Sequence, residues 1–229
     1  QASCRSYETF LRERVLQPLG LENTGVDRND AILPRRAAGY ARDAQGQLIH
    51  APYIDMSLPH AAGSLYSTTH DLARWCDRLF GGKLLSPASL EKMISPHLSD
   101  YALGLGVKTE GGRRVIQHGG GIEGFNSYLA FYPDPQLAVV VLANVNGPAA
   151  TELAGELAAV ALGDPAAFPA ERPVAVLPSS GLAGYVGVYR LTDKVTIAVR
   201  QRDDHLTVQL SGQAEFPLFP ESGTKFFLK

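Results

Sequence analysis

The spacing of apolar residues changes at Tyr101 from a helical period to a strand period, and this change constrains the fold more than any other feature of the sequence. Before it, apolar residues recur every three or four positions over 68–80, and Pro87 opens a second helical segment that ends before Pro96. After it, short apolar runs typical of strands occupy 101–107, 114–118, 127–132 and 137–144. A further helical pattern over 151–162 completes an α+β domain, in which helices flank an antiparallel sheet.

The first 60 residues carry weaker signals. Ser6 precedes a helical pattern through Gln17, which Pro18 and Gly20 end. Residues 22–60 are rich in Pro, Gly, Asn and Asp, which predicts a long loop that carries a small hairpin.

A second domain is expected after a linker. Residues 164–180 hold four prolines among Ala, Arg and Ser, a composition typical of an interdomain linker. Beyond it we expect only short strands, which form an antiparallel domain over 181–229 whose pattern ends in mid-strand: 185–191, 195–202, 205–210, 215–219 and 225–228.

Composition excludes several classes of protein. Because 21 basic and 23 acidic side chains leave a net charge of −2, we expect no nucleic-acid partner. No run approaches the roughly 20 apolar residues of a membrane span. The six histidines show no metal-ligand spacing, and no phosphate loop or dinucleotide fingerprint occurs, so we expect no metal and no cofactor. Whether Cys4 and Cys76 pair stays open.

One Ser-x-x-Lys sequence runs from Ser89 to Lys92. On a helix this spacing can place an amine beside a hydroxyl nucleophile. Here the buried helix face is expected to hold Leu90, Met93 and Ile94, which leaves Ser89 and Lys92 on the polar face. We therefore interpret this pair as a solvated helix face.

The most informative sequence for chemistry is His118-Gly119-Gly120-Gly121, at the end of an expected strand. Three successive glycines remove side chains where another backbone or a ligand must come close. A histidine beside them can shuttle a proton or donate a hydrogen bond. The alternative is a glycine-rich turn with a surface histidine, and the residues alone leave both open.

Several blocks of sequence occur in a defined order over about residues 5–163: Ser6–Glu8, Arg14–Thr24, Gly39–Tyr40, Ala62–Trp75, Gly119–Pro133 and Val141–Asn146. Together they resemble the C-terminal part of a class C β-lactamase-like serine hydrolase. That superfamily includes penicillin-binding carboxypeptidases, D-aminopeptidases and esterases. The resemblance implies that 1–163 is the latter part of a β-lactamase/transpeptidase-like catalytic domain that lacks its N-terminal part. The segments Tyr185–Tyr189 and Gly212–Ser222 are similar to the lipocalin-like domain appended to many such hydrolases, which implies a small, incomplete β-barrel-like domain over 181–229.

The resemblance also implies roles for the glycine triplet. His118-Gly119-Gly120 occupies the place of the family's third motif, Lys-Thr-Gly or a variant such as His-x-Gly, and contributes to substrate binding. The N–H of Gly121 would supply one of two oxyanion-hole donors, each worth roughly 2.7–4 kcal/mol of transition-state stabilisation. His118 would replace the lysine as a catalytic residue, helping to place substrate and tune the proton network.

Two further positions bear on the substrate. Asn146 matches a class C position near the carboxylate of the substrate, and the alternative that it caps a helix or a turn after a buried strand stays open. Glu152 replaces an arginine of class C enzymes, and a neutral imidazole at 118 carries less charge than an ammonium. Both disfavour β-lactams and favour esters, amides or peptides.

The family's nucleophile motifs, Ser-x-x-Lys and Tyr-x-Asn, would precede the region resembling Ser6–Gly20, and no Tyr-x-Asn occurs in the 229 residues. We therefore expect part of a hydrolase that acts through an acyl-enzyme on a small-molecule or peptide substrate, with the isolated chain inactive. One alternative is an N-terminal half present as a separate chain. Others are a non-catalytic peptide- or ligand-binding module and a truncated chain without independent function. Many relatives are exported, but the sequence does not show the compartment.

Overall fold

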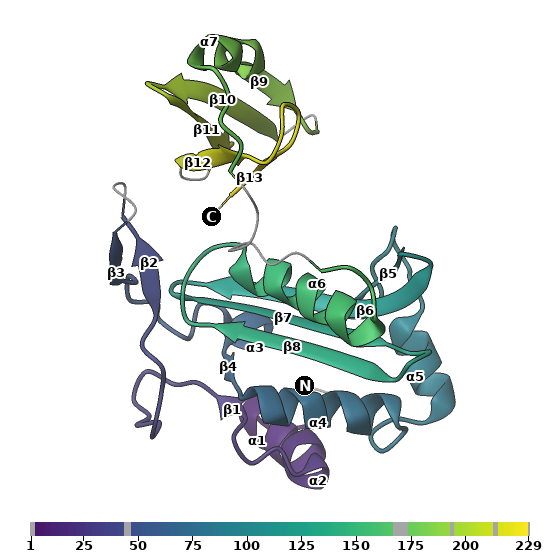
Figure 1. Cartoon of the computed structure of the whole chain (residues 1–229). Coiled ribbons are helices and arrows are strands. Elements are labelled where there is room, and N and C mark those ends of the chain that lie inside the picture. Colours follow the sequence, from purple (N-terminus) through teal and green to yellow (C-terminus); the bar gives the residue numbers. More distant parts are fainter. Residues whose placement is uncertain (1–2, 44–46, 167–173, 193–194, 213–214, 229) are drawn as a thin grey trace. The chain divides into compact units, whose positions relative to one another are not determined.

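The chain forms two compact units in the computed structural model, Gln1–Ala166 and Ala167–Lys229 (Figure 1). The structure describes residues 3–43, 47–166, 174–192, 195–212 and 215–228. Each unit has its own sheet and its own buried residues, and each is described separately below.

The first unit is built around a four-stranded antiparallel sheet with the strand order β5-β6-β7-β8. Two-residue turns join its first three strands, and the first turn uses Gly111 and Gly112 at φ of 55° and 78°, the left-handed values that a tight hairpin requires. The strands are β5 (Gly106–Glu110), β6 (Arg113–Ile122), β7 (Phe125–Tyr132) and β8 (Leu137–Ala143).

Helices cover both faces of this sheet (Figure 1). Helix α6 (Ala149–Leu162) turns three alanines toward one face, and these small side chains allow close packing on Val115, Val139 and Val141. Helices α4 (Thr69–Phe80) and α5 (Pro87–Ile94) pack on the other face, around Ile116 and Phe131. The predicted α+β arrangement, an antiparallel sheet flanked by helices, is confirmed.

The N-terminal segment forms one helical stretch, as predicted, but with a π-helical middle turn. Helix α1 (Tyr7–Leu11) continues through η1 (Arg12–Leu16) into α2 (Gln17–Leu19). The oxygen of Ser6 accepts from the N–H of Thr9 at 3.2 Å, and Gly20 ends the stretch at φ 67°.

The long loop contains small paired elements. The expected hairpin is present as β2 (Tyr40–Arg42) paired with β3 (Leu48–His50). A second pair joins β1 (Gly25–Val26) to β4 (Leu65–Tyr66), and α3 (His60–Gly63) precedes β4.

The second unit is an open five-stranded antiparallel sheet with the order β13-β12-β11-β10-β9. It follows α7 (Ser179–Leu182) and a 3-10 turn at Ala183–Tyr185. Its strands are β9 (Gly187–Arg190), β10 (Thr196–Arg202), β11 (His205–Leu210), β12 (Glu215–Pro220) and β13 (Phe226–Phe227).

This second sheet is not closed into the expected barrel in the part of the chain that the structure describes. Closure requires the two edge strands to pair with each other, whereas β9 pairs only with β10 and β13 only with β12. The short edges explain the difference, because β13 has two residues and β9 has four.

Candidate active site

The end of β6 projects past its neighbour on one side. Strand β5 pairs with β6 only as far as Gly106 opposite Gln117, whereas β7 pairs with β6 through Ile122 opposite Phe125. The stretch 118–122 therefore has a partner strand along one edge and none from β5 along the other.

The register of the sheet decides which backbone groups face that open edge. In an antiparallel strand, alternate residues direct their N–H and C=O groups to opposite edges. The two-residue turn closes at Ile122 and Phe125, so the N–H and C=O of Ile122 face β7. Gly121, one residue earlier, and Gly119, two residues before that, therefore direct their N–H and C=O groups to the opposite edge, beyond the point where pairing with β5 stops at Gly106. Both glycines are exposed, so a ligand can reach these groups.

The missing side chains of the triplet have different consequences at each position. A Cβ at Gly120 would lie 2.7 Å from the hydroxyl of Ser127, a distance that real Cβ contacts essentially never show. A Cβ at Gly121 would lie 3.1 Å from the amide nitrogen of Asn126, whereas one at Gly119 would make an ordinary 3.4 Å contact with a ring. Close packing thus accounts best for the absence of a side chain at Gly120 and least for its absence at Gly119.

His118 lies at the head of this open segment, on the sheet face that α4 and α5 cover. It shares that face with Ile116 because side chains two residues apart on a strand point the same way. The ring is exposed, and its Nε2 lies 2.9 Å from the hydroxyl of Tyr101. The two ring centroids are 5.9 Å apart at an interplanar angle of 65°.

Asn146 is engaged with the turn between β6 and β7. Its Oδ1 accepts from the N–H of Gly124 at 2.7 Å, and its Nδ2 donates to the carbonyl of Ile122 at 2.8 Å. A longer contact of 3.4 Å joins Nδ2 to Oδ1 of Asn126. The residue therefore caps a turn, the alternative left open by the sequence, and its contact with a substrate stays a prediction.

Two buried carboxylates that the sequence did not single out hold the surrounding loops. Asp71, at the start of α4, accepts from the N–H of Asn23 at 2.7 Å and from the hydroxyl of Thr24 at 2.9 Å. The carboxylate of Asp27 accepts hydrogen bonds from both terminal nitrogens of Arg36, at 2.9 and 2.7 Å. The only signal in the sequence was the place of Asp71 three residues after Thr68, which predicts a cap but not a loop anchor.

A cleft of about 520 Å³ lies between the start of α1 and the loops around 26–30 and 56–64. Tyr7 and His60 line it with their ring centroids 5.9 Å apart, and burial raises the pKa of Tyr7. The lining contains neither His118 nor Asn146, so neither of these predicted site residues faces this cleft.

The helix that carries the Ser-x-x-Lys sequence shows no catalytic contact. Ser89 and Lys92 are exposed, and the hydroxyl of Ser89 accepts from that of Ser86 at 3.0 Å. Within the described ranges, no hydrogen bond joins Ser89 to Lys92, no group of three His, Cys, Asp or Glu side chains could hold a metal, and no helix could span a membrane. Cys4 is exposed while Cys76 is buried, and burial raises the pKa of Cys76 to about 12.

Comparison with known families identifies the first unit. The family model described as beta-lactamase matches residues 1–163, which contain the sheet, its helices and the His118 segment. The chain belongs to the beta-lactamase family. A domain of unknown function, DUF3471, matches residues 171–229, and the lipocalin-like assignment of this region is not confirmed.

Individual relatives agree with this assignment. A penicillin-binding protein of Bacillus subtilis is 28% identical over 256 residues, which cover 100% of this chain and 56% of the relative. An unguisins hydrolase of Aspergillus campestris is 30% identical over 154 residues, which cover 58% of this chain and 28% of the relative. The chain thus spans about half the length of the first of these relatives and less of the second.

Solved structures give the same fold. The octameric penicillin-binding protein homologue from Pyrococcus abyssi superposes with a TM-score of 0.63 at 24% identity, covering 96% of this chain and 52% of that one. A D-stereospecific amidohydrolase from Streptomyces gives 0.53 at 27% identity, covering 62% of this chain and 44% of that one. The predicted β-lactamase/transpeptidase-like fold of the first unit is therefore confirmed.

Proposed function

We propose that this chain forms part of the acyl-transfer site of a serine hydrolase that cleaves an ester, amide or peptide bond. The observation that carries the proposal is the open edge of β6, where the exposed residues Gly119 and Gly121 follow His118 and direct their N–H groups away from β7. Backbone N–H groups that do not pair within a sheet can stabilise an oxyanion without any rearrangement.

The chemistry assigned to this edge is a two-step acyl transfer. A serine hydroxyl attacks the carbonyl carbon of the substrate and loses its proton to a base, while the carbonyl oxygen takes the negative charge and is held by N–H groups at the edge of β6. The amine or alcohol then leaves with a proton, and water hydrolyses the acyl-enzyme. Gly121 is the assigned oxyanion donor, and His118 contacts the substrate.

The nucleophile is proposed to come from outside this chain. In the described part of the protein, no serine hydroxyl is hydrogen-bonded to the side chain of a lysine or a histidine, the arrangement that activates a serine. No Tyr-x-Asn occurs in the sequence either. The partner is therefore a segment that carries Ser-x-x-Lys and Tyr-x-Asn, in a longer polypeptide or in a separate chain.

Amides of D-amino acids are the first substrates to test. The similar Streptomyces protein is a D-stereospecific amidohydrolase, which supports an amide substrate for this chain. A neutral imidazole at His118 and a carboxylate at Glu152, in the first turn of α6, both offer little attraction for the carboxylate of a penicillin. We therefore expect hydrolysis of amides and esters that lack a carboxylate to exceed that of penicillins.

Labelling with a fluorophosphonate tests the proposal. The isolated chain should take up no label, and a longer polypeptide that contains it together with the nucleophile motifs should be labelled. In that polypeptide, His118→Ala should lower kcat/KM for an amide substrate by about 10²-fold or more. The matched control His205→Ala, in the second unit, should change it less than twofold. Labelling of the isolated chain, or equal activities of the two variants, would contradict the proposal.

A second candidate is a binding module without catalysis. An exposed strand edge can pair with an extended peptide through backbone hydrogen bonds alone, and the 118–122 segment offers such an edge. Peptide-induced shifts of the Gly119 and Gly121 amide signals, without cleavage by the longer polypeptide, would favour this candidate.

A further inference from the structure

Tyr101 is held in a fixed place beside the start of β5. Its N–H donates to the carbonyl of Leu98 at 3.0 Å, and its own carbonyl accepts from the N–H groups of His97 at 2.9 Å and Leu98 at 3.3 Å. Its backbone also forms an isolated antiparallel bridge with Gly106, the first residue of β5, which pairs with Gln117 of β6. The backbone of Tyr101 is therefore fixed close to the point where the open edge of β6 begins.

From this place the Tyr101 side chain contacts His118. The hydroxyl lies 2.9 Å from Nε2, and the edge-on ring contact restricts rotation of both rings. In the part of the protein that the structure describes, this is the one side-chain hydrogen bond found for either residue. The other ring nitrogen of His118, Nδ1, makes no hydrogen bond within the described residues, and the residue is exposed.

The direction of this hydrogen bond follows from acid–base chemistry. A neutral imidazole carries one proton on one of its two nitrogens, and the other nitrogen is an acceptor. A phenol is a stronger acid than a neutral imidazole N–H, and an imidazole nitrogen is a stronger base than a phenol oxygen. The favoured arrangement therefore has the Tyr101 hydroxyl donating to Nε2, which places the ring proton on Nδ1.

We propose that Tyr101 is a positioning residue that fixes the tautomer of His118, so that Nδ1–H donates toward the ligand. The consequence for substrate rests on the function proposed above. A ligand group beside Nδ1 must then offer an oxygen acceptor, such as a carbonyl or a carboxylate, and an ammonium group is disfavoured. Because the proton is already on Nδ1, a substrate oxygen can accept this hydrogen bond without any proton transfer.

Nitrogen-15 NMR of the histidine rings tests this proposal on the chain itself. At about pH 9 a histidine side chain is neutral, and the shifts of Nδ1 and Nε2 report which nitrogen carries the proton. We expect His118 to be mainly the Nδ1–H tautomer in the native protein. A free neutral imidazole side chain prefers the Nε2–H tautomer, so Tyr101→Phe should invert the ratio. A native protein with mainly Nε2–H at His118 would overturn the proposal without any variant.

The matched control is Tyr189→Phe, which removes a hydroxyl that donates to the carbonyl of Tyr185 at 2.8 Å in the second unit. It should leave the His118 ring shifts unchanged, and an equal change in both variants would overturn the proposal. Fluorescence of Trp75, the single tryptophan, checks that the first unit remains folded. Because the tautomer is read without turnover, its inversion in Tyr101→Phe would stand even if the longer polypeptide had no hydrolase activity.

Discussion

At the scale of single residues, Asn146 links three parts of the first unit. It follows β8, and its amide bonds to both ends of the turn that joins β6 to β7. The N–H and C=O of Tyr40 pair with the same segment, through Asn144 and Asn146 at 3.0 Å each. Asn146 therefore stabilises the turn that places the glycine triplet, whether or not it also contacts a substrate.

Replacing Asn146 measures what its contacts with the turn contribute to stability. Asn146→Ala removes the acceptor of the Gly124 N–H and the donor to the Ile122 carbonyl, so we expect a loss of about 1–3 kcal/mol in the free energy of unfolding. Asn146→Asp should cost a similar amount, because a carboxylate oxygen would face the carbonyl of Ile122. Urea unfolding followed by Trp75 fluorescence measures both.

The control for these variants is Asn144→Ala. Among the described residues, the side chain of Asn144 makes one hydrogen bond, to the carbonyl of Ala38 at 2.9 Å, and its loss should cost about 0.5–1.5 kcal/mol. Asn146 variants that unfold at the same urea concentration as the native chain would show that the contacts with the turn contribute nothing to stability.

At the scale of elements, the β6–β7 turn is fixed from outside as well as by Asn146. Gly124 is buried at φ 81°, and its backbone approaches Gly39, which precedes β2. A Cβ at Gly124 would lie 2.7 Å from the Cα of Gly39 and 2.7 Å from the Cβ of Ala51. Two glycines thus let the β2–β3 hairpin and the β6–β7 turn come into contact.

Gly124→Ala should be among the most destabilising substitutions in the first unit. The left-handed conformation costs a residue with a Cβ about 1–2 kcal/mol, and overpacking adds about 1–3 kcal/mol. Gly82→Ala is the matched control, because Gly82 has φ 72° and no atom within 4 Å of its added Cβ. We expect Gly124→Ala to cost about 3 kcal/mol and Gly82→Ala about 1 kcal/mol. Equal losses in urea unfolding would show that the Gly39 contact adjusts without cost.

The sequence predicted the helices better than it predicted the ends of the strands. Helices α4 and α5 follow directly from caps at Thr68 and Ser86, whose oxygens accept from N–H groups three residues later. The strand expected at 101–107 instead begins at Gly106, because Gly104 turns the chain at φ 78°. Strand β6 runs four residues further than expected, since the glycines continue to pair with β7.

The candidate site was only partly accessible to sequence reasoning. His118 and the glycines could be selected from their order along the chain. The open edge, however, depends on where β5 begins, at Gly106, and no local pattern fixes that position. The contact of Tyr101 with His118 joins residues 17 positions apart and follows from the backbone path of 97–106. Asn146 could be selected, but its contacts with the turn depend on tertiary structure.

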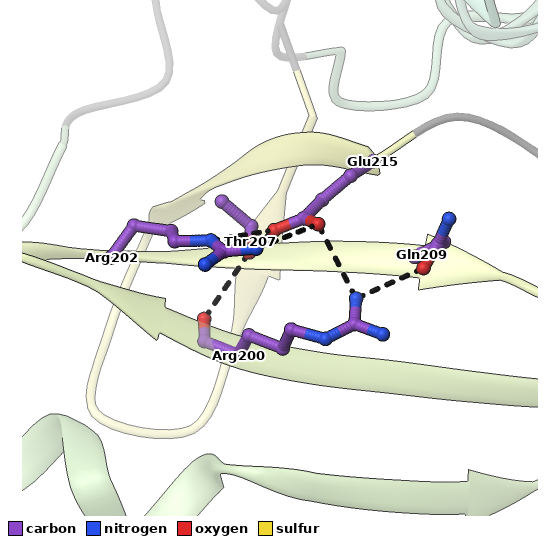
Figure 2. A network of polar contacts seen from close by, with 5 residues as sticks. All are labelled: Arg200, Arg202, Thr207, Gln209 and Glu215. Atoms are coloured by element: carbon purple, nitrogen blue, oxygen red, sulfur yellow. Dashed lines mark hydrogen bonds and ion pairs between the residues drawn. The ribbon is translucent and has the colours of Figure 1, made fainter.

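At the scale of the whole molecule, different interactions stabilise the two units. The first unit buries apolar side chains on both faces of its sheet. The second buries Leu206 on one face of its sheet and carries a polar network on the other face (Figure 2). In that network Glu215 of β12 accepts from Arg202 at 3.1 and 3.2 Å, from Arg200 at 3.3 Å, and from Thr207.

This network makes the stability of the second unit depend on pH. The hydrogen bonds from Arg202 and then from Thr207 lower the pKa of Glu215 from 4.5 to about 2. Because the folded-state pKa lies below the unfolded value, the network stabilises the fold above about pH 4.5, and this contribution is lost as the pH falls to about 2. The ring signals of Phe226 and Phe227, in β13, should report this loss in an NMR titration.

Glu215→Gln isolates this contribution from the titration of other carboxylates. The amide cannot ionise, so the variant should be less stable than the native chain at pH 7, and the difference should shrink as the pH falls from 4.5 toward 2. The control is Glu221→Gln, also in the second unit, which should leave the difference near zero throughout. A gap between native chain and Glu215→Gln that stays constant with pH would mean that the carboxylate charge does not contribute, and that the network stabilises β10–β12 only through hydrogen bonds that the amide also makes.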